Sequence, residues 1–145
     1  MILDTDRPPS DSSMIRHFYE HEEEFEMLLE QVDEWPGNWL TVEYAQHPDS
    51  YIPRLDEARE VALQEQLERL GLESIGASQE DMNDSFTAHM QVYGFGKQKG
   101  YAYLSNPNWQ KVHDENLNKM DVYDRVVFRR IKGNWFLYLR GKERE

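Results

Sequence analysis

The spacing of hydrophobic residues changes along this chain, and that change limits the possible folds more than any other feature. Over residues 15–32 the apolar side chains recur every three or four positions, which is the period of an amphipathic helix. From residue 85 onward, apolar Phe86, Ala88 and Met90 alternate with polar residues, which is the period of a strand with one buried face. Helices followed mainly by strands predict an α+β fold.

The sequence predicts two helices. The first covers residues 13–33, after a cluster of serine and aspartate N-cap candidates and before Pro36-Gly37. The second follows Asp56 as N-cap and ends at Leu70, and Gly71 stands where a left-handed residue commonly closes a helix. Its buried side is expected to consist of Ala58, Ala62, Leu63, Leu67 and Leu70.

The expected strands cover residues 39–44, 85–95, 99–104, 125–131 and 134–140. The last two form a hairpin around Lys132-Gly133-Asn134. We therefore expect two helices packed on one side of an antiparallel sheet of four to six strands, with β-hairpins at the C-terminal end. Residues 1–12 are turn-like and polar and are expected to be a flexible tail, which leaves residues 13–145 as a single domain.

Regular pairing of the last hairpin assigns its side chains to two faces. The face expected to join the core carries Val126, Phe128, Trp135, Leu137 and Leu139, with Arg130 near the turn. The opposite face combines arginines with aromatic rings, which is the composition that interface centres favour. The candidate binding residues on it are Arg125, Arg129, Arg140, Phe136 and Tyr138. We expect at least two of these arginines to be accessible and to contact an acidic protein partner or an anionic ligand.

A second aromatic group fits either core packing or a surface that contacts a ligand or partner. Its members are Tyr93, Phe95, Tyr101, Tyr103 and Trp109.

Charge is distributed unevenly along the chain, whose net charge is −12. Residues 1–96 hold 22 acidic and 5 basic residues, whereas residues 97–145 hold 6 acidic and 11 basic residues. The overall charge disfavours binding to duplex nucleic acid, because that binding depends on Lys and Arg neutralising phosphates. Two interpretations stay open: the halves neutralise each other within the fold, or they form opposed patches that serve a partner.

The residue types exclude several kinds of chemistry. The chain has no cysteine, which excludes disulfides and cysteine-based metal sites. His17 and His21 fit the pattern H-x-x-E-H, which in one class of zinc peptidases places two imidazoles one helical turn apart. Those peptidases are long chains with a further glutamate ligand, so we expect this pair to lie on a solvated helix face. His17 and His21 are thus only weak metal candidates, and no cofactor is expected.

No stretch of the sequence is long and apolar enough to span a membrane, and the first residues do not resemble a signal peptide. We therefore expect a cytoplasmic protein.

Several motifs resemble those of a family of small uncharacterised bacterial proteins. They are Lys99-Gly100-Tyr101-Ala102-Tyr103-Leu104, Ile131-Lys132-Gly133-Asn134-Trp135-Phe136-Leu137-Tyr138-Leu139, Phe18-Tyr19 with Phe25, and Leu70-Gly71-Leu72. The resemblance implies a bacterial globular domain. It supplies no activity, cofactor or site residues.

From these observations we expect a non-enzymatic domain that binds another protein. One alternative is a small-molecule binder or enzyme with a pocket between the sheet and the helices. Another is an immunity-type inhibitor whose acidic half blocks a basic toxin. The sequence does not predict an oligomeric state.

Overall fold

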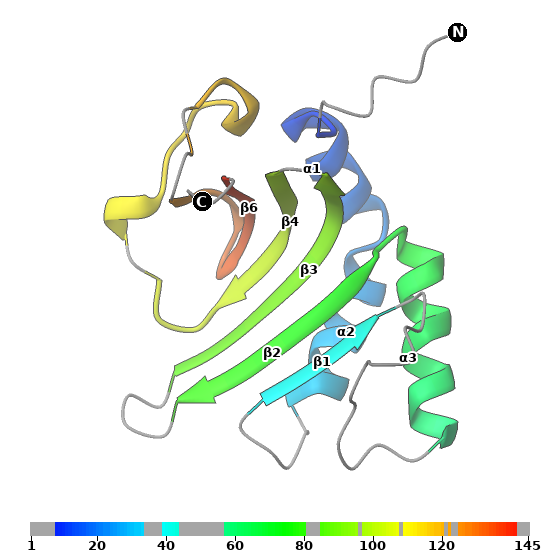
Figure 1. The fold of residues 1–145 in the computed structure, drawn as a ribbon. Helices are drawn as coiled ribbons and strands as arrows, with labels where there is room; N and C mark the ends of the chain where they lie inside the picture. The colour runs from blue at the N-terminus through cyan, green and yellow to red at the C-terminus, as the bar shows by residue number, and fades with distance from the viewer. Residues whose placement is uncertain are drawn as a thin grey trace, which may run out of the picture.

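In the computed structural model, helices cover one side of an antiparallel sheet (Figure 1), which is the α+β fold predicted. The structure describes residues 8–33, 39–43, 57–80, 85–95, 97–107, 109–120, 122 and 125–141. The helices are α1 (Asp11–Glu20), α2 (Glu22–Asp33), α3 (Glu57–Leu70) and two short 3-10 turns, η1 (Trp109–Lys111) and η2 (Leu117–Lys119). The strands are β1 (Trp39–Glu43), β2 (Ser74–Glu80), β3 (Ser85–Phe95), β4 (Lys97–Leu104), β5 (Val126–Lys132) and β6 (Trp135–Arg140). The sheet order is β1-β2-β3-β4-β6-β5.

The predicted first helix is two helices that meet at His21. The His21 backbone leaves the helical conformation, and its N–H donates to the carbonyl oxygens of both His17 and Phe18. Three glutamates follow directly and occupy the first turn of α2, where the helix dipole favours negative charge. The glutamate run therefore begins a second helix, whereas the sequence reading placed it inside one helix.

The prediction of a flexible tail over residues 1–12 includes residues that belong to the first helix and its N-cap. Helix α1 begins at Asp11, with Ser10 as N-cap, and the Ser10 side chain accepts a hydrogen bond from the Ser13 N–H. Asp11 is itself buried. Residues 8–12 thus belong to the folded part, while residues 1–7 lie outside the described residues.

Helix α3 ends as predicted. Gly71 has a φ of 71°, its N–H donates to Glu68, and the Leu72 N–H donates to Leu67 over 2.8 Å. These two bonds form a Schellman motif, with Leu72 buried behind it. Leu63, Leu67 and Leu70 are buried as expected, but Ala58 and Ala62 are exposed, so the buried stripe is narrower than predicted. Asp56, the expected N-cap, lies outside the described residues.

Strand β2 has no counterpart among the predicted strands. Its sequence, Ser-Ile-Gly-Ala-Ser-Gln-Glu, contains few residues that favour strands. Pairing with β1 on one side and β3 on the other stabilises it, and Ile75 and Ala77 reach the core.

The last hairpin contains a β-bulge that reverses part of the predicted face assignment. Lys132 pairs with Trp135, but the register then shifts by one residue, so that Arg129 lies opposite Leu137. Ile131 is the extra residue of the bulge. The core-face prediction is therefore wrong for Val126 and Phe128 and right for Trp135, Leu137 and Leu139, which lie in the core under the helices with Val127.

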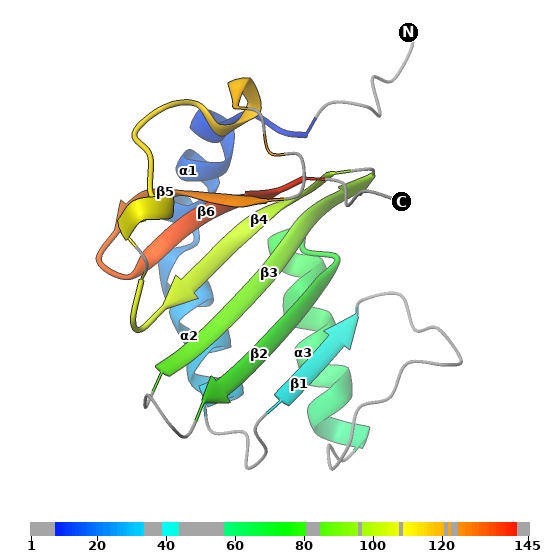
Figure 2. The same cartoon turned by 60° about the vertical axis from the view of Figure 1, so that its left-hand side comes forward.

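Strand β6 is buried on both faces, which explains its uninterrupted apolar sequence. On the helix side, the rings of Phe18, Phe25 and Tyr103 pack around Trp135; the centroids of Phe18 and Trp135 lie 5.2 Å apart. On the outer side a smaller cluster comprises Ala102, Leu104, Phe128, Phe136 and Tyr138. Segment 109–120 runs along the β5 edge of the sheet (Figure 2), where Val112 bridges to Phe128.

Candidate functional site

The five predicted binding residues do not share one accessible surface. Arg125 and Arg140 are exposed, but Phe136 and Tyr138 are buried in the outer cluster. Because of the bulge, Arg129 lies on the opposite face of the sheet, where it forms an ion pair with Asp11 over 2.9 Å. The predicted Arg–aromatic surface is therefore corrected: its two rings are outer-core residues, and one of its arginines points to the helix side.

Arg129 belongs to a buried polar network that ties α1 to the sheet. The Lys99 side chain is 0% exposed, and its ammonium donates to Asp11 Oδ1 over 2.5 Å, to the Pro9 carbonyl over 2.7 Å and to Asn118 Oδ1 over 2.8 Å. The second Asp11 oxygen accepts from Arg129 and from the Leu117 N–H.

The electrostatics of the network favour a structural role. Burial lowers the pKa of Lys99, and the Asp11 carboxylate partly opposes that effect. Burial alone would raise the pKa of Asp11, but the hydrogen bonds from Lys99, the Leu117 N–H and Arg129 outweigh it and hold the pKa below its usual value. All three ammonium protons of Lys99 are already donated to protein oxygens, so none is left for a ligand.

The outer face instead presents Trp109 and Arg130, here called the Trp109 surface. Trp109 is 56% exposed, and the Arg130 guanidinium carbon lies 5.8 Å from the centre of its ring. The Arg130 Nε–H donates to the Gly133 carbonyl over 2.9 Å. The Trp109 ring packs against the Phe136 ring, with the two ring centroids 6.0 Å apart. An exposed tryptophan is thus held in place by a cation and by the outer core. The assumed regular hairpin had put Arg130 on the core face, so only the bulge places it here.

Beside this surface, His89 packs against Tyr138 across the small residues of β4. The two ring centroids are 5.1 Å apart and nearly perpendicular. Burial and the nearby Arg140 charge lower the pKa of His89 to about 4, so this imidazole is neutral at pH 7. Arg140 thus lies close to His89 and Tyr138. The Tyr138 ring, however, is buried and packs in the outer cluster, so it is not accessible to a partner.

His17 and His21 lie at the junction of α1 and α2, with ring centroids 4.6 Å apart. His17 Nε2 donates to the Leu70 carbonyl over 2.8 Å, which fastens α1 to the end of α3. His21 Nδ1 lies 3.4 Å from a Glu24 oxygen. Within the described residues, no three His, Asp or Glu side chains are close enough together to hold a metal ion.

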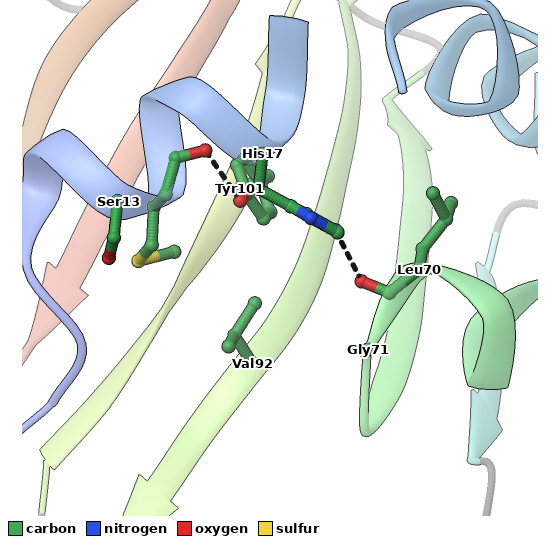
Figure 3. Close-up of a pocket in the computed structure, with 7 residues that line it drawn as sticks. Ser13, His17, Leu70, Gly71, Val92 and Tyr101 are labelled. Atoms are coloured by element: carbon green, nitrogen blue, oxygen red, sulfur yellow. Dashed lines mark hydrogen bonds between the residues drawn. The ribbon is translucent and has the colours of Figure 1, made fainter. Parts of the chain in front are cut away.

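A pocket of about 230 Å³ lies between the helices and the sheet (Figure 3). Helix α1 contributes Ser13, Met14 and His17, the end of α3 contributes Leu70 and Gly71, and the sheet contributes Val92 and Tyr101. This is the location that the small-molecule alternative requires. Of its residues, only Tyr101, in the second aromatic group, and His17, as a weak metal candidate, were named from the sequence as possible contact residues. The sequence pattern did not bring them together, because the lining residues converge from four elements far apart in the sequence.

Comparison with known proteins adds no assignment, since the chain matches no protein-family model, no curated protein and no solved structure. The resemblance to a bacterial family therefore stays a prediction. None of the helices in the described ranges is long and apolar enough to cross a membrane.

Proposed function

We propose that this chain is a non-enzymatic binding domain whose Trp109 surface binds an acidic segment of a partner protein. The observation that carries the proposal is the exposure of Trp109 together with its fixed position under Arg130. A large aromatic side chain that is already ordered loses little conformational entropy when a partner covers it. Tryptophan and arginine are also the residues most enriched where interfaces gain their binding energy.

The charge on the outer side of the sheet, around the Trp109 surface, favours an acidic partner. On the helix side, Lys99 and Arg129 form ion pairs with Asp11, and Lys132 forms one with Glu22. On the outer side, Lys111 and Arg140 are exposed and form no ion pair with any described residue. Exposed cations on the same side of the sheet as an aromatic anchor attract carboxylates and speed association with them. A cytoplasmic location and the absence of duplex nucleic acid as a partner, both expected from the sequence, belong to this proposal.

The hydrogen bonding of the buried charged side chains favours binding over catalysis as the function. Asp11 and Lys99 are the buried charged residues among those described, and both are saturated by hydrogen bonds within the protein. Their charges therefore stabilise the fold and are not poised for proton transfer to a substrate.

A peptide titration tests the proposal. We expect a peptide of alternating Glu and Leu to shift the indole N–H resonance of Trp109 saturably, and a peptide of alternating Lys and Leu to leave it unchanged. Arg130→Glu should abolish the shift. Arg16→Glu, which changes the charge equally on the exposed side of α1, is the matched control and should retain it. Equal binding of both peptides, or equal loss in both variants, would contradict the proposal.

The acidic helices favour a second candidate, the immunity-type inhibitor of a basic protein. Helix α2 contains six acidic residues and no basic residue. Met27 is 53% exposed and Val61 is 46% exposed. The exposed glutamates near them that form no ion pair with a described residue include Glu23, Glu30, Glu65 and Glu68. If this side is the binding surface, the Lys–Leu peptide will shift the Met27 methyl resonance. Glu30→Lys should then abolish the shift, and Glu115→Lys, in segment 109–120 at the β5 edge of the sheet, should not.

A further inference from the structure

Two backbone irregularities border the pocket between α1, α3 and the sheet. Gly71 closes α3 with a φ of 71°, and a Cβ placed on it would meet no atom within 4 Å. On the opposite wall, Val92 is the extra residue of a bulge in β3, where the pairing with β4 shifts between Gln91 and Tyr93. Bulges re-aim side chains and are common beside binding sites.

Two hydrogen bonds between different elements hold the walls in place (Figure 3). The His17 Nε2–H donates to the Leu70 carbonyl over 2.8 Å, and the Tyr101 hydroxyl donates to the Met14 carbonyl over 2.7 Å. Burial raises the pKa of Tyr101, so its hydroxyl keeps the proton that this bond requires. The pocket is therefore preformed, and its exposed rim at Ser13 and Gly71 gives access from solvent.

The lining combines apolar side chains with the imidazole of His17. Met14, Leu70, Val92 and the Tyr101 ring supply apolar surface. Because the Leu70 carbonyl can only accept, His17 Nε2 carries the proton, and in the neutral ring Nδ1 is an acceptor. No described residue donates to Nδ1.

We infer that this pocket binds a small aromatic molecule that carries one hydrogen-bond donor. Its volume of about 230 Å³ exceeds the roughly 150 Å³ of a dry apolar cavity that takes up benzene, so a two-ring molecule the size of indole fits. The ring would lie against Val92 and Tyr101, and the donor would face His17. The inference is independent of the proposed function, because the pocket lies on the helix side of the sheet and Trp109 on the outer side.

Titration with indole, followed by amide resonances, tests the inference. Indole should saturably shift the resonances of Met14, Gly71 and Val92 and leave that of the Trp109 indole unchanged. With 1-methylindole, which has the same rings but no donor, binding should be roughly three- to tenfold weaker, the range that one neutral hydrogen bond gives.

Variants that fill the pocket complete the test. Val92→Phe should weaken indole binding at least about tenfold, and Val61→Phe, the same change on the exposed side of α3, should leave binding unchanged. If Val92→Phe does not fold, Ser13→Phe fills the pocket from an exposed position and should have the same effect. The absence of saturable shifts at Met14, Gly71 and Val92, or unaltered binding in the folded pocket variant, would overturn the inference.

Discussion

At the scale of single residues, Asp11 is the side chain on which most of the buried polar network depends. It is the one anion between two cations, Lys99 and Arg129. Asp11→Asn leaves both positive charges near each other and is expected to lower the free energy of unfolding by about 3–5 kcal/mol. Lys99→Met should cost less, because Arg129 and the Leu117 N–H still neutralise and bond the carboxylate.

Urea unfolding of the two variants measures this order. Lys132→Met is the control, because it removes an exposed ion pair with Glu22 and should change the unfolding midpoint little. A larger loss for Lys99→Met than for Asp11→Asn would show that the network is not centred on the carboxylate.

His89 gives the stability of the protein a defined pH dependence. Its pKa falls from 6.5 to about 4 on folding, so its contribution is complete above pH 6.5 and is lost as the pH falls from 6.5 toward 4. Because the ring is partly exposed, solvent screens its charge and the loss should be smaller than the full pKa change implies. We expect a loss of stability on the order of 2 kcal/mol. Asp11, whose pKa lies below 3.8, loses its contribution only at lower pH. His89→Phe keeps a ring against Tyr138 and should flatten the curve between pH 6.5 and 4 in urea unfolding at successive pH values; an unchanged curve would contradict the assignment.

At the scale of elements, periodicity and turn residues were predictive where the chain is regular. The period of two placed β3 and β4, and Gly71 placed the end of α3. Deviations by one residue escaped the pattern: the break at His21, and the bulge at Ile131 that moves Arg129 to the helix side and Arg130 to the outer face. Both depend on tertiary packing, which periodicity does not report. The second aromatic group included Trp109 as a possible contact residue, but its pairing with Arg130 was missed for the same reason, since the two meet only after the bulge.

Two glycines are required for different reasons: Gly71 for its left-handed backbone conformation, and Gly100 for the close approach of a neighbouring strand. At Gly71 an added Cβ meets nothing, so Gly71→Ala should cost only about 1 kcal/mol for the left-handed conformation. At Gly100 the added Cβ would clash with the Met90 carbonyl oxygen, so Gly100→Ala forces β3 and β4 apart and should cost more. Thermal unfolding of both variants compares the two costs, and an equal loss of stability would show that the strands yield without penalty.

At the scale of the whole molecule, the acidic and basic halves of the sequence neutralise each other only in part. Ion pairs join them at Asp11 and at Lys132 with Glu22. The exposed glutamates of α2 and α3, among them Glu23, Glu30, Glu65 and Glu68, form no ion pair with any described residue. The helical side is therefore a strongly negative surface, and the Trp109 surface lies on the opposite side of the sheet.

This arrangement predicts how salt affects stability. Like charges on α2 and α3 repel one another, and at 0.1 M ionic strength charges more than about 10 Å apart are screened. If repulsion among the glutamates exceeds the attraction between the halves, added NaCl will raise the urea midpoint. Glu30→Lys will then raise the midpoint at low salt and reduce its salt dependence, whereas Glu115→Lys, in segment 109–120 and outside the glutamates of α2 and α3, will have a smaller effect. A midpoint that falls with added salt would instead mean that attraction between the halves dominates. The acidic helices would then act mainly as counter-charge for the sheet, and the case for them as a surface that binds a basic protein would be lost.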